Sequence, residues 1–155
     1  MSEIVPVDNT NLLQAAEIHA AAWRYAHRAF CSAEFVALHT PERQRDYLRK
    51  KLNGGSRIFM LTDGEPVGIV SVTGNLIEDL YVLPRMQRRG YGRRLLDFAA
   101  AACDGAPTLW ILENNGNAEA FYRRAGFRET GRVNAAGRIP EKEFERTERA
   151  EWKSR

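Results

Sequence analysis

The sequence has 155 residues, with 23 Lys and Arg residues against 20 Asp and Glu residues, so its formal net charge is +3. That length suits one domain with its own apolar core, and we expect a single domain over residues 1–155 that needs no disulfide or metal for stability. Hydrophobic residues make up 44% of the chain and charged residues 28%, which excludes a disordered or collagen-like protein.

No segment of the sequence predicts export or membrane insertion. No apolar run approaches the roughly 18 residues needed to span a bilayer. The first residues, MSEIVPVDNTN, lack the cationic region and long apolar stretch of a secretory signal. The two cysteines, Cys31 and Cys103, have neither zinc-site nor redox spacing. We therefore expect a cytoplasmic protein with no membrane partner.

The first half of the chain predicts a strand, two helices and a hairpin. The second helix is the best marked, because Thr40 precedes a proline at its first position and Gly54 follows its last turn. The hairpin has apolar strands on either side of an Asp63-Gly64 turn. The expected elements are a strand over Glu3–Asp8, helices over Asn9–Phe30 and Pro41–Leu52, and a hairpin over 57–75.

The second half alternates strands and helices before two final strands. The expected elements are strands over Leu76–Pro84 and Thr108–Glu113, helices over Gly92–Cys103 and Asn117–Ala125, and strands over 127–133 and 143–149. Strand–helix–strand units imply parallel pairing, whereas hairpins imply antiparallel pairing. The sequence therefore predicts an α/β (α+β mixed) fold with a central, mixed, mostly antiparallel twisted sheet and helices on both of its faces.

A glycine-containing turn joins the strand at Leu76–Pro84 to the helix that follows it. Its sequence is Gln87-Arg88-Arg89-Gly90-Tyr91-Gly92. Two glycines at a helix N-terminus let backbone N–H groups face an anion such as a pyrophosphate. The third glycine of a dinucleotide fingerprint is missing, because position 95 is Leu95, and no P-loop follows. The alternative is an ordinary strand-to-helix turn with a basic surface.

A second motif runs from Asn115 to Phe127. Within it, Ala118, Phe121, Tyr122 and Ala125 recur at helical spacing, which places Tyr122 on the buried side of a helix. Taken alone, Tyr122 could be a core tyrosine with a satisfied hydroxyl, and Asn115 or Asn117 could be a helix N-cap.

The order of these motifs, a strand, QRRGYG, a helix, a strand and NxxAxxFYxxxGF, closely resembles the GNAT superfamily of acyl-CoA-dependent N-acetyltransferases. The resemblance is strong over residues 76–127, and the segment IHAAAWRYAHRAF resembles small bacterial members more loosely. It implies a GNAT-like fold and acetyl-CoA as cosubstrate. It also implies roles for individual residues: cofactor contacts from Leu80, Tyr81, Val82, Gln87, Arg88, Arg89, Gly90, Tyr91, Gly92, Arg93, Asn115 and Arg124, and Tyr122 beside the thioester sulfur.

The chemistry of acetyl transfer gives independent reasons for some of these residue types. An amine that attacks a thioester creates an oxyanion, which the free N–H groups of a bulged strand can stabilise. The leaving thiolate needs a proton or a hydrogen bond, which Tyr122 can supply. An alkylamine is mostly protonated near neutral pH, so a base is expected. Glu78 and Asp79 are candidates, and strand alternation directs them to opposite faces, so at most one of them faces the substrate. Glu78 is preferred over Asp79, and Glu113 is a third candidate.

The acceptor is predicted only as a primary amine of a small molecule or a protein, bound between the front helices and a loop around 133–143. His27, Phe30, Glu34, Phe35 and Arg138 are available there. His19, His27 and His39 lack metal-ligand spacing, so no metal is expected. The protein could be a monomer or a homodimer.

Two other functions fit parts of the pattern. One is a non-catalytic CoA-binding regulatory module on the same fold. The other is a nucleic-acid binder that uses the arginines of segment 85–94. Tyr91 is the only aromatic residue among those arginines, so stacking on bases is poorly supported and no nucleic-acid partner is expected.

Overall fold

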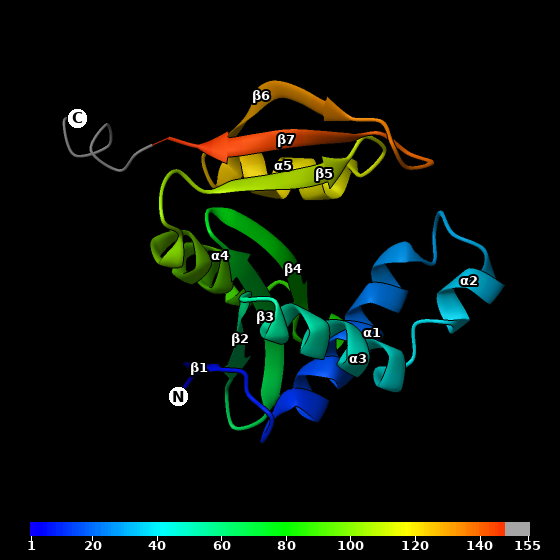
Figure 1. The fold of residues 1–155 in the computed structure, drawn as a ribbon, viewed down its shortest axis with the longest axis vertical. Coiled ribbons are helices and arrows are strands. Elements are labelled where there is room, and N and C mark those ends of the chain that lie inside the picture. Colours follow the sequence, from blue (N-terminus) through cyan, green and yellow to red (C-terminus); the bar gives the residue numbers. More distant parts are fainter. Residues whose placement is uncertain (148–155) are drawn as a thin grey trace.

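The computed structural model describes residues 1–147 and contains a seven-stranded sheet (Figure 1). Its strands are β1 (Glu3–Pro6), β2 (Arg57–Thr62), β3 (Pro66–Thr73), β4 (Leu76–Val82), β5 (Thr108–Leu112), β6 (Phe127–Asn134) and β7 (Glu141–Arg146). The helices are α1 (Leu12–His27), α2 (Ala33–Ala37), α3 (Pro41–Asn53), α4 (Tyr91–Ala102) and α5 (Gly116–Arg124), with a short 3-10 helix η1 at Pro84–Met86.

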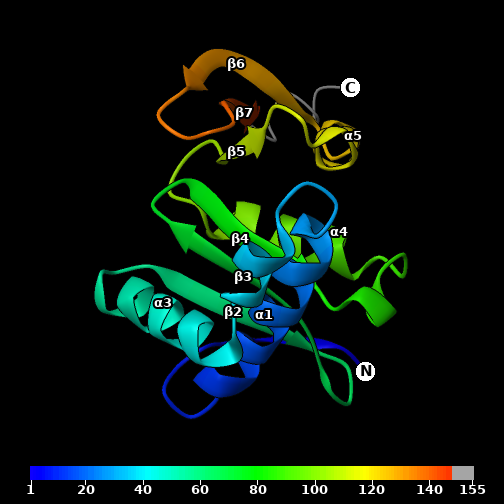
Figure 2. The same cartoon turned by 90° about the vertical axis from the view of Figure 1, so that its right-hand side faces the viewer.

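The sheet has the order β1-β2-β3-β4-β5-β7-β6, and every neighbouring pair is antiparallel except β4 and β5. Helices α1 and α3 pack on one face, where Leu48 and Ile69 share a core cluster. Helix α4 packs on the other face, where Leu95 lies in a second cluster with Val70. Figure 2 shows α1 and α3 in front of the strands and α4 behind them. The predicted mixed, mostly antiparallel sheet with helices on both faces is confirmed.

Most expected elements are present with shifted ends. The first helix ends at His27 rather than at Phe30, and a separate short helix, α2, follows it, which the sequence patterns did not predict. The last strand begins at Glu141, two residues before the expected start, and the final two residues of the expected strand lie outside the described residues. The predicted cap of α3 is confirmed, since Thr40 Oγ1 accepts a hydrogen bond of 3.2 Å from the Arg43 N–H.

Gly68 allows α4 to approach strand β3 closely. A Cβ atom at Gly68 would lie 2.8 Å from both Leu95 Cδ1 and the Tyr81 carbonyl oxygen. Gly68→Ala is therefore expected to lower the free energy of unfolding by about 1–3 kcal/mol, because the helix must move away. Urea unfolding measures the loss. Gly105→Ala is the control, since nothing lies within 4 Å of its Cβ position, and equal losses in the two variants would contradict the packing explanation.

The sheet opens between its two parallel strands. β4 and β5 pair only at Leu76 and Thr108, after which the strands diverge (Figure 1). On its other side β4 is bulged: Ile69 pairs with Tyr81 and Ser71 with Glu78, so two residues of β4 lie opposite one residue of β3. One of those two, Asp79, has a left-handed φ of 54°. The opening and the bulge lie side by side along β4, and together they shape the site.

Candidate active site

A cavity of about 640 Å³ lies between the diverging strands. It is bordered by β4 and β5, by the start of α5 and by the last turns of α1. Several of the residues predicted for the site lie on its wall: Glu78, Leu80, Tyr81, Val82, Gln87, Asn115 and Tyr122. The structure therefore brings the predicted catalytic residues and the predicted β4 contacts into one space. Glu113, the third candidate base, is exposed and is not among the residues that line the cavity.

The glycine turn forms the N-terminus of α4 with no side-chain cap. Gly90 is the N-cap residue, with a φ of 87°, and Arg88 is also left-handed at 65°. Helices α2, α3 and α5, by contrast, are capped by Ser32, Thr40 and Asn115. The first N–H groups of α4 have no acceptor within the helix and lie at the positive end of its dipole, so they can bind an anion.

Charged side chains surround this turn. Arg88, Arg89 and Arg93 are exposed, and Arg93 forms an ion pair with Asp97 on the next turn of α4. Tyr91 points elsewhere, because its hydroxyl donates a hydrogen bond of 2.5 Å to Asp63 in the β2–β3 turn. Tyr91 can therefore contribute to an anion site through its backbone N–H, while the three arginines supply positive charge.

The turn is held next to β4 and α5. Gln87 Nε2 donates a hydrogen bond of 3.2 Å to the Val82 carbonyl at the end of β4. Phe121 of α5 packs over Gly92, whose Cβ position lies 3.7 Å from the edge of the ring. Arg124 is exposed and comes three residues after Phe121 on α5, so it belongs to the side of that helix that approaches the turn.

Tyr122 lies on α5 with its ring against Phe121 and Phe127, at centroid distances of 5.1 Å and 5.9 Å. Burial raises the pKa of Tyr122, so its hydroxyl is protonated at neutral pH and can act as a donor. Within residues 1–147 no side chain or backbone group hydrogen-bonds that hydroxyl. The reading of Tyr122 as a core tyrosine with a satisfied hydroxyl therefore does not fit the described part of the chain.

Asn115 is the N-cap of α5 and also part of the cavity wall. Its Oδ1 accepts a hydrogen bond of 3.2 Å from the Ala118 N–H. Its Nδ2 group has no partner among residues 1–147 and remains available as a donor. The capping role and the predicted ligand contact therefore use different atoms of one side chain.

The prediction that Glu78 and Asp79 face opposite sides of the sheet is wrong. Lys51 Nζ donates hydrogen bonds to Glu78 Oε1 at 2.8 Å and to Asp79 Oδ2 at 2.6 Å. Strict alternation holds only in a regular strand, and the left-handed conformation of Asp79 interrupts it. Both carboxylates consequently share one ammonium group, and both border the cavity.

Asp79 is held in a polar cluster beneath the bulge. Its carboxylate accepts hydrogen bonds from Ser71 Oγ at 2.8 Å, from the Tyr47 hydroxyl at 3.1 Å and from His19 Nε2 at 3.1 Å. Burial disfavours the charge, but the bond from His19 and the charge of Lys51 outweigh it and lower the pKa of Asp79. Asp79 is thus charged at neutral pH and a poor base there.

Sequence reasoning missed the partners of Asp79. His19, Tyr47 and Lys51 come from α1 and α3, far from β4 in the chain. Burial raises the pKa of Tyr47 to about 12, with a further contribution from the Asp79 charge. One sequence signal could have pointed to this cluster, because His19 lies on the apolar side of a helix. The side chain is almost fully buried, and a buried histidine needs a hydrogen-bond partner.

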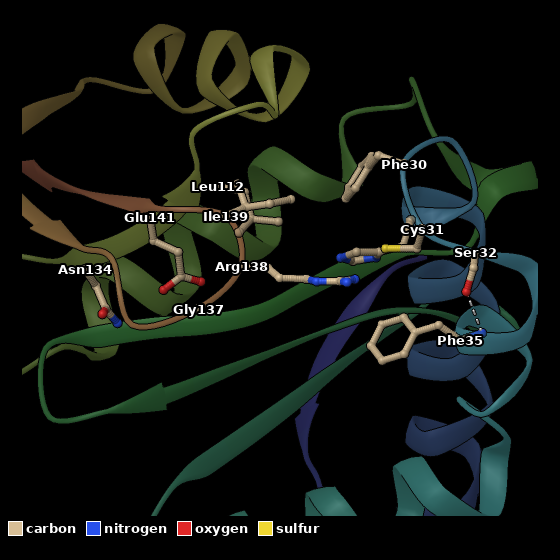
Figure 3. Close-up of a pocket in the computed structure, with 11 residues that line it drawn as sticks. Phe30, Cys31, Ser32, Phe35, Leu112, Asn134, Gly137, Arg138, Ile139 and Glu141 are labelled. Carbon is tan, nitrogen blue, oxygen red and sulfur yellow. Dashed lines mark hydrogen bonds between the residues drawn. The ribbon is translucent and has the colours of Figure 1, made fainter.

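A second cavity, of about 920 Å³, adjoins the first and shares His27, Leu112 and Glu141 with it. Figure 3 shows its two walls: Phe30, Cys31, Ser32 and Phe35 on one side, and the β6–β7 loop with Arg138 on the other. The front helices and the last loop therefore do border one space, as predicted, although Glu34 is not among its lining residues. Glu141 and Cys31 were not anticipated.

The described residues contain no group of three or more His, Cys, Asp or Glu side chains arranged to hold a metal ion. In the same part of the chain, no helix combines the length and the apolar character required to cross a bilayer.

Comparisons with known proteins agree with this geometry. Residues 54–129 match the family model of the acetyltransferase (GNAT) domain. The peptidyl-lysine N-acetyltransferase YjaB of Salmonella typhimurium is 35% identical over 68 residues, which cover 44% of this chain and 46% of that protein. The probable N-acetyltransferase Rv2775 of Mycobacterium tuberculosis is 32% identical over 91 residues, 54% and 52% of the two chains. The chain thus matches about half the length of these relatives.

Solved structures match almost the whole chain. The PaiA N-acetyltransferase of Thermoplasma acidophilum, in complex with coenzyme A, superposes with a TM-score of 0.74 at 15% identity and covers 96% of this chain and 99% of that one. The apo form of YjaB from Escherichia coli gives 0.71 at 23% identity, covering 94% and 97%. These structures share the fold of the chain, and the family model matches its residues 54–129. Residues 54–129 are thus similar to the acetyltransferase (GNAT) domain, and the chain has the fold of these N-acetyltransferase structures.

Proposed function

We propose that this protein is an N-acetyltransferase that moves an acetyl group from acetyl-CoA to a primary amine, which attacks the thioester directly. The observation that carries the proposal is the opening between β4 and β5, which runs from the glycine turn past Tyr122 into the second cavity. Two substrates can meet there from opposite ends. The match of residues 54–129 to the acetyltransferase (GNAT) domain and the fold shared with PaiA, whose structure is a coenzyme A complex, support the donor. The similarity to YjaB, a peptidyl-lysine N-acetyltransferase, supports an amine acceptor.

The residues around the glycine turn fit the pyrophosphate of acetyl-CoA. The start of α4 is uncapped, Gly90 and Arg88 turn the backbone, and exposed arginines flank it. An extended ligand arm that leaves this turn would run along β4, whose edge toward β5 is unpaired beyond Leu76. Bound there, acetyl-CoA supplies an activated acetyl thioester.

The bulge in β4 supplies donors for the developing negative charge. Because Asp79 and Leu80 together oppose a single residue of β3, one N–H in this stretch lacks a cross-strand partner. A fixed N–H beside the thioester carbonyl stabilises the oxygen as it gains charge, without the reorganisation that water would need.

Tyr122 serves the leaving group. As the new N–C bond forms and the C–S bond breaks, the electron pair of the C–S bond goes to sulfur. The protonated Tyr122 hydroxyl donates a hydrogen bond or its proton to that sulfur. The amine must also lose a proton. Glu78 is on the cavity wall, but accepting the proton would disrupt its ion pair with Lys51.

Gly90→Asp is expected to weaken coenzyme A binding at least about tenfold, because it adds a negative charge at the start of α4 and a side chain where backbone must approach the ligand. Isothermal titration calorimetry with coenzyme A measures the change. Gly55→Asp is the control, since Gly55 has a similar left-handed φ of 98° and open surroundings but follows α3. Unchanged affinity in folded Gly90→Asp protein would exclude this turn as the pyrophosphate site.

The proposed activity is tested by release of free thiol from acetyl-CoA with a panel of amines: polyamines, aminoglycosides, amino acids and peptides with free lysines or N-termini. Thiol release that depends on one class of amine identifies the acceptor. Tight binding of acetyl-CoA with no thiol release from any amine would favour a non-catalytic CoA-binding module. Competition between coenzyme A and DNA would indicate a nucleic-acid binder instead.

A further inference from the structure

His27 lies where the two cavities meet. It ends α1, it is half-buried, and it lines both the space beside Tyr122 and the space bounded by the β6–β7 loop. Its ring stacks on Trp23, with centroids 3.9 Å apart and an interplanar angle of 12°. The side chain is therefore held in one orientation at the border between the two proposed substrates.

The hydrogen bonding of His27 fixes its tautomer. Nδ1 lies 2.8 Å from the Trp23 carbonyl oxygen, which can only accept, so Nδ1 carries the hydrogen and Nε2 keeps a lone pair. Nε2 is on the far side of the ring from that carbonyl and hence points away from the helix backbone. We propose that Nε2 of His27 accepts the proton of the attacking amine, an inference that rests on the proposed acetyl transfer.

The carboxylates near the thioester are less suited to this task. Glu78 is committed to Lys51 at 2.8 Å, and Asp79 is held by four donors. Glu113 is outside both cavities. Glu141 borders both cavities, as His27 does, and is the one serious competitor. Its negative charge is well suited to attract a cationic amine into the site before the proton leaves.

The surroundings of His27 keep it uncharged near neutral pH. Burial lowers the pKa of His27, and the charge of His19 on the same helix lowers it further. The hydrogen bond to the Trp23 carbonyl raises the pKa but does not outweigh burial. Across the cavities it is faced by Arg138 and Glu141 from the last loop and strand, by Cys31 from the α1–α2 loop, and by Glu78 and Asp79 from β4. A neutral imidazole of this kind can accept a proton at pH 7.

In the proposed step Nε2 of His27 takes one proton from the protonated amine, and the neutral nitrogen then bonds to the acetyl carbon. The C–S bond breaks with its electron pair going to sulfur, which leaves as a thiolate and takes a proton from Tyr122. The second proton that the nitrogen loses as the amide forms restores the Tyr122 hydroxyl. The imidazolium then loses its proton to water, which restores the starting state. No oxidant or further reactant is required.

Kinetics of His27→Asn test the proposal. The Asn amide can still donate to the Trp23 carbonyl but has no basic nitrogen. The probes are propylamine, a cation at pH 7, and trifluoroethylamine, which is already neutral there. His27→Asn is expected to lower kcat/KM for propylamine about tenfold or more at pH 7, less at pH 9–10, and to affect trifluoroethylamine little. Equal, pH-independent losses with both amines would overturn the assignment.

His39→Asn is the matched control. His39 also stacks on Trp23, at 3.5 Å, and its Nδ1 also bonds the carbonyl four residues earlier, at 3.1 Å from Phe35 O, but it lines neither of the two cavities. The His39→Asn variant should leave kcat/KM for both amines unchanged at every pH. Glu78→Gln and Glu141→Gln are measured beside it, and a larger loss at neutral pH in either one, with a recovery at high pH, would transfer the role from His27 to that carboxylate.

The tautomer can be examined without any acceptor. Long-range ¹H–¹⁵N spectra of the wild-type protein are expected to show His27 neutral at pH 7 with its hydrogen on Nδ1. A hydrogen on Nε2, or a protonated ring at pH 7, would overturn the inference even if acetyl transfer were established. A wild-type protein that releases no thiol with any amine would contradict the proposed acetyl transfer. Thiol release by the wild-type protein, with no selective loss in His27→Asn, would contradict only the role of His27.

Discussion

Tyr122→Phe is expected to lower kcat by between about 10²-fold and 10⁴-fold while leaving acetyl-CoA binding nearly unchanged. The substitution removes only the hydroxyl, and a positioned acid typically contributes a rate factor of that size. Tyr122 lines the cavity and its hydroxyl has no hydrogen-bond partner in residues 1–147. Burial raises the pKa of Tyr122, so its proton is in place at neutral pH. Steady-state kinetics at saturating acetyl-CoA, with calorimetry for affinity, measure both quantities.

A structural role for Tyr122 predicts a different result. The ring packs against Phe121 and Phe127, and phenylalanine preserves those contacts. The loss of a hydroxyl that has no partner in the described chain should change the free energy of unfolding by less than about 1 kcal/mol. Tyr25→Phe, at an exposed position of α1, controls for the chemical change itself. An unchanged kcat in Tyr122→Phe would show that Tyr122 has only a structural role in the core.

Asp79→Ala is expected to lower the free energy of unfolding by about 3–5 kcal/mol, because it leaves the ammonium of Lys51 buried without its closest partner. The side chain of Asp79 is 9% exposed and that of Lys51 is 13% exposed, so water replaces the lost contact poorly. Chemical denaturation measures the loss. Asp46→Ala on the exposed surface of α3 is the control, and a loss of similar size there would contradict the role of burial.

The same carboxylate makes stability depend on pH. The folded protein lowers the pKa of Asp79 below its ordinary value of about 4, so the unfolded chain binds the proton more readily. The contribution of Asp79 is therefore complete above about pH 4 and is lost as the pH falls further, toward the folded-state pKa. In Asp79→Ala this part of the acid destabilisation should be missing. An identical decline below pH 4 in both proteins would assign it to other groups.

Local chemistry explains which parts of the fold could be predicted from the sequence. Thr40 and Pro41 mark the start of α3, and Asp63 and Gly64 mark the hairpin turn, since each signal acts within a few residues. The glycine turn likewise predicts the start of α4, which has Gly90 as its N-cap residue and no side-chain cap. Helix α2 has only five residues and none of them is buried, so no periodic apolar face predicts it.

The site itself depends on contacts that no local pattern encodes. The bulge at Asp79 is stabilised by Lys51 and Tyr47 of α3 and by His19 of α1, and strand alternation alone predicted the wrong direction for its side chain. His27 and Glu141 come together only through the tertiary fold, more than a hundred residues apart. The sequence could identify Tyr122 and Glu78 as candidates, but not the ion pair that engages Glu78.

The divergence of β4 and β5 gives the molecule two sheet edges in its interior. Exposed edges usually invite pairing with a strand of another chain, and proteins protect them with charges, bulges or covering helices. Here the bulge at Asp79 interrupts one edge, while α1 and α5 contribute to the walls around both. The bulge and the helices around the opening thus also protect both edges against pairing with another chain.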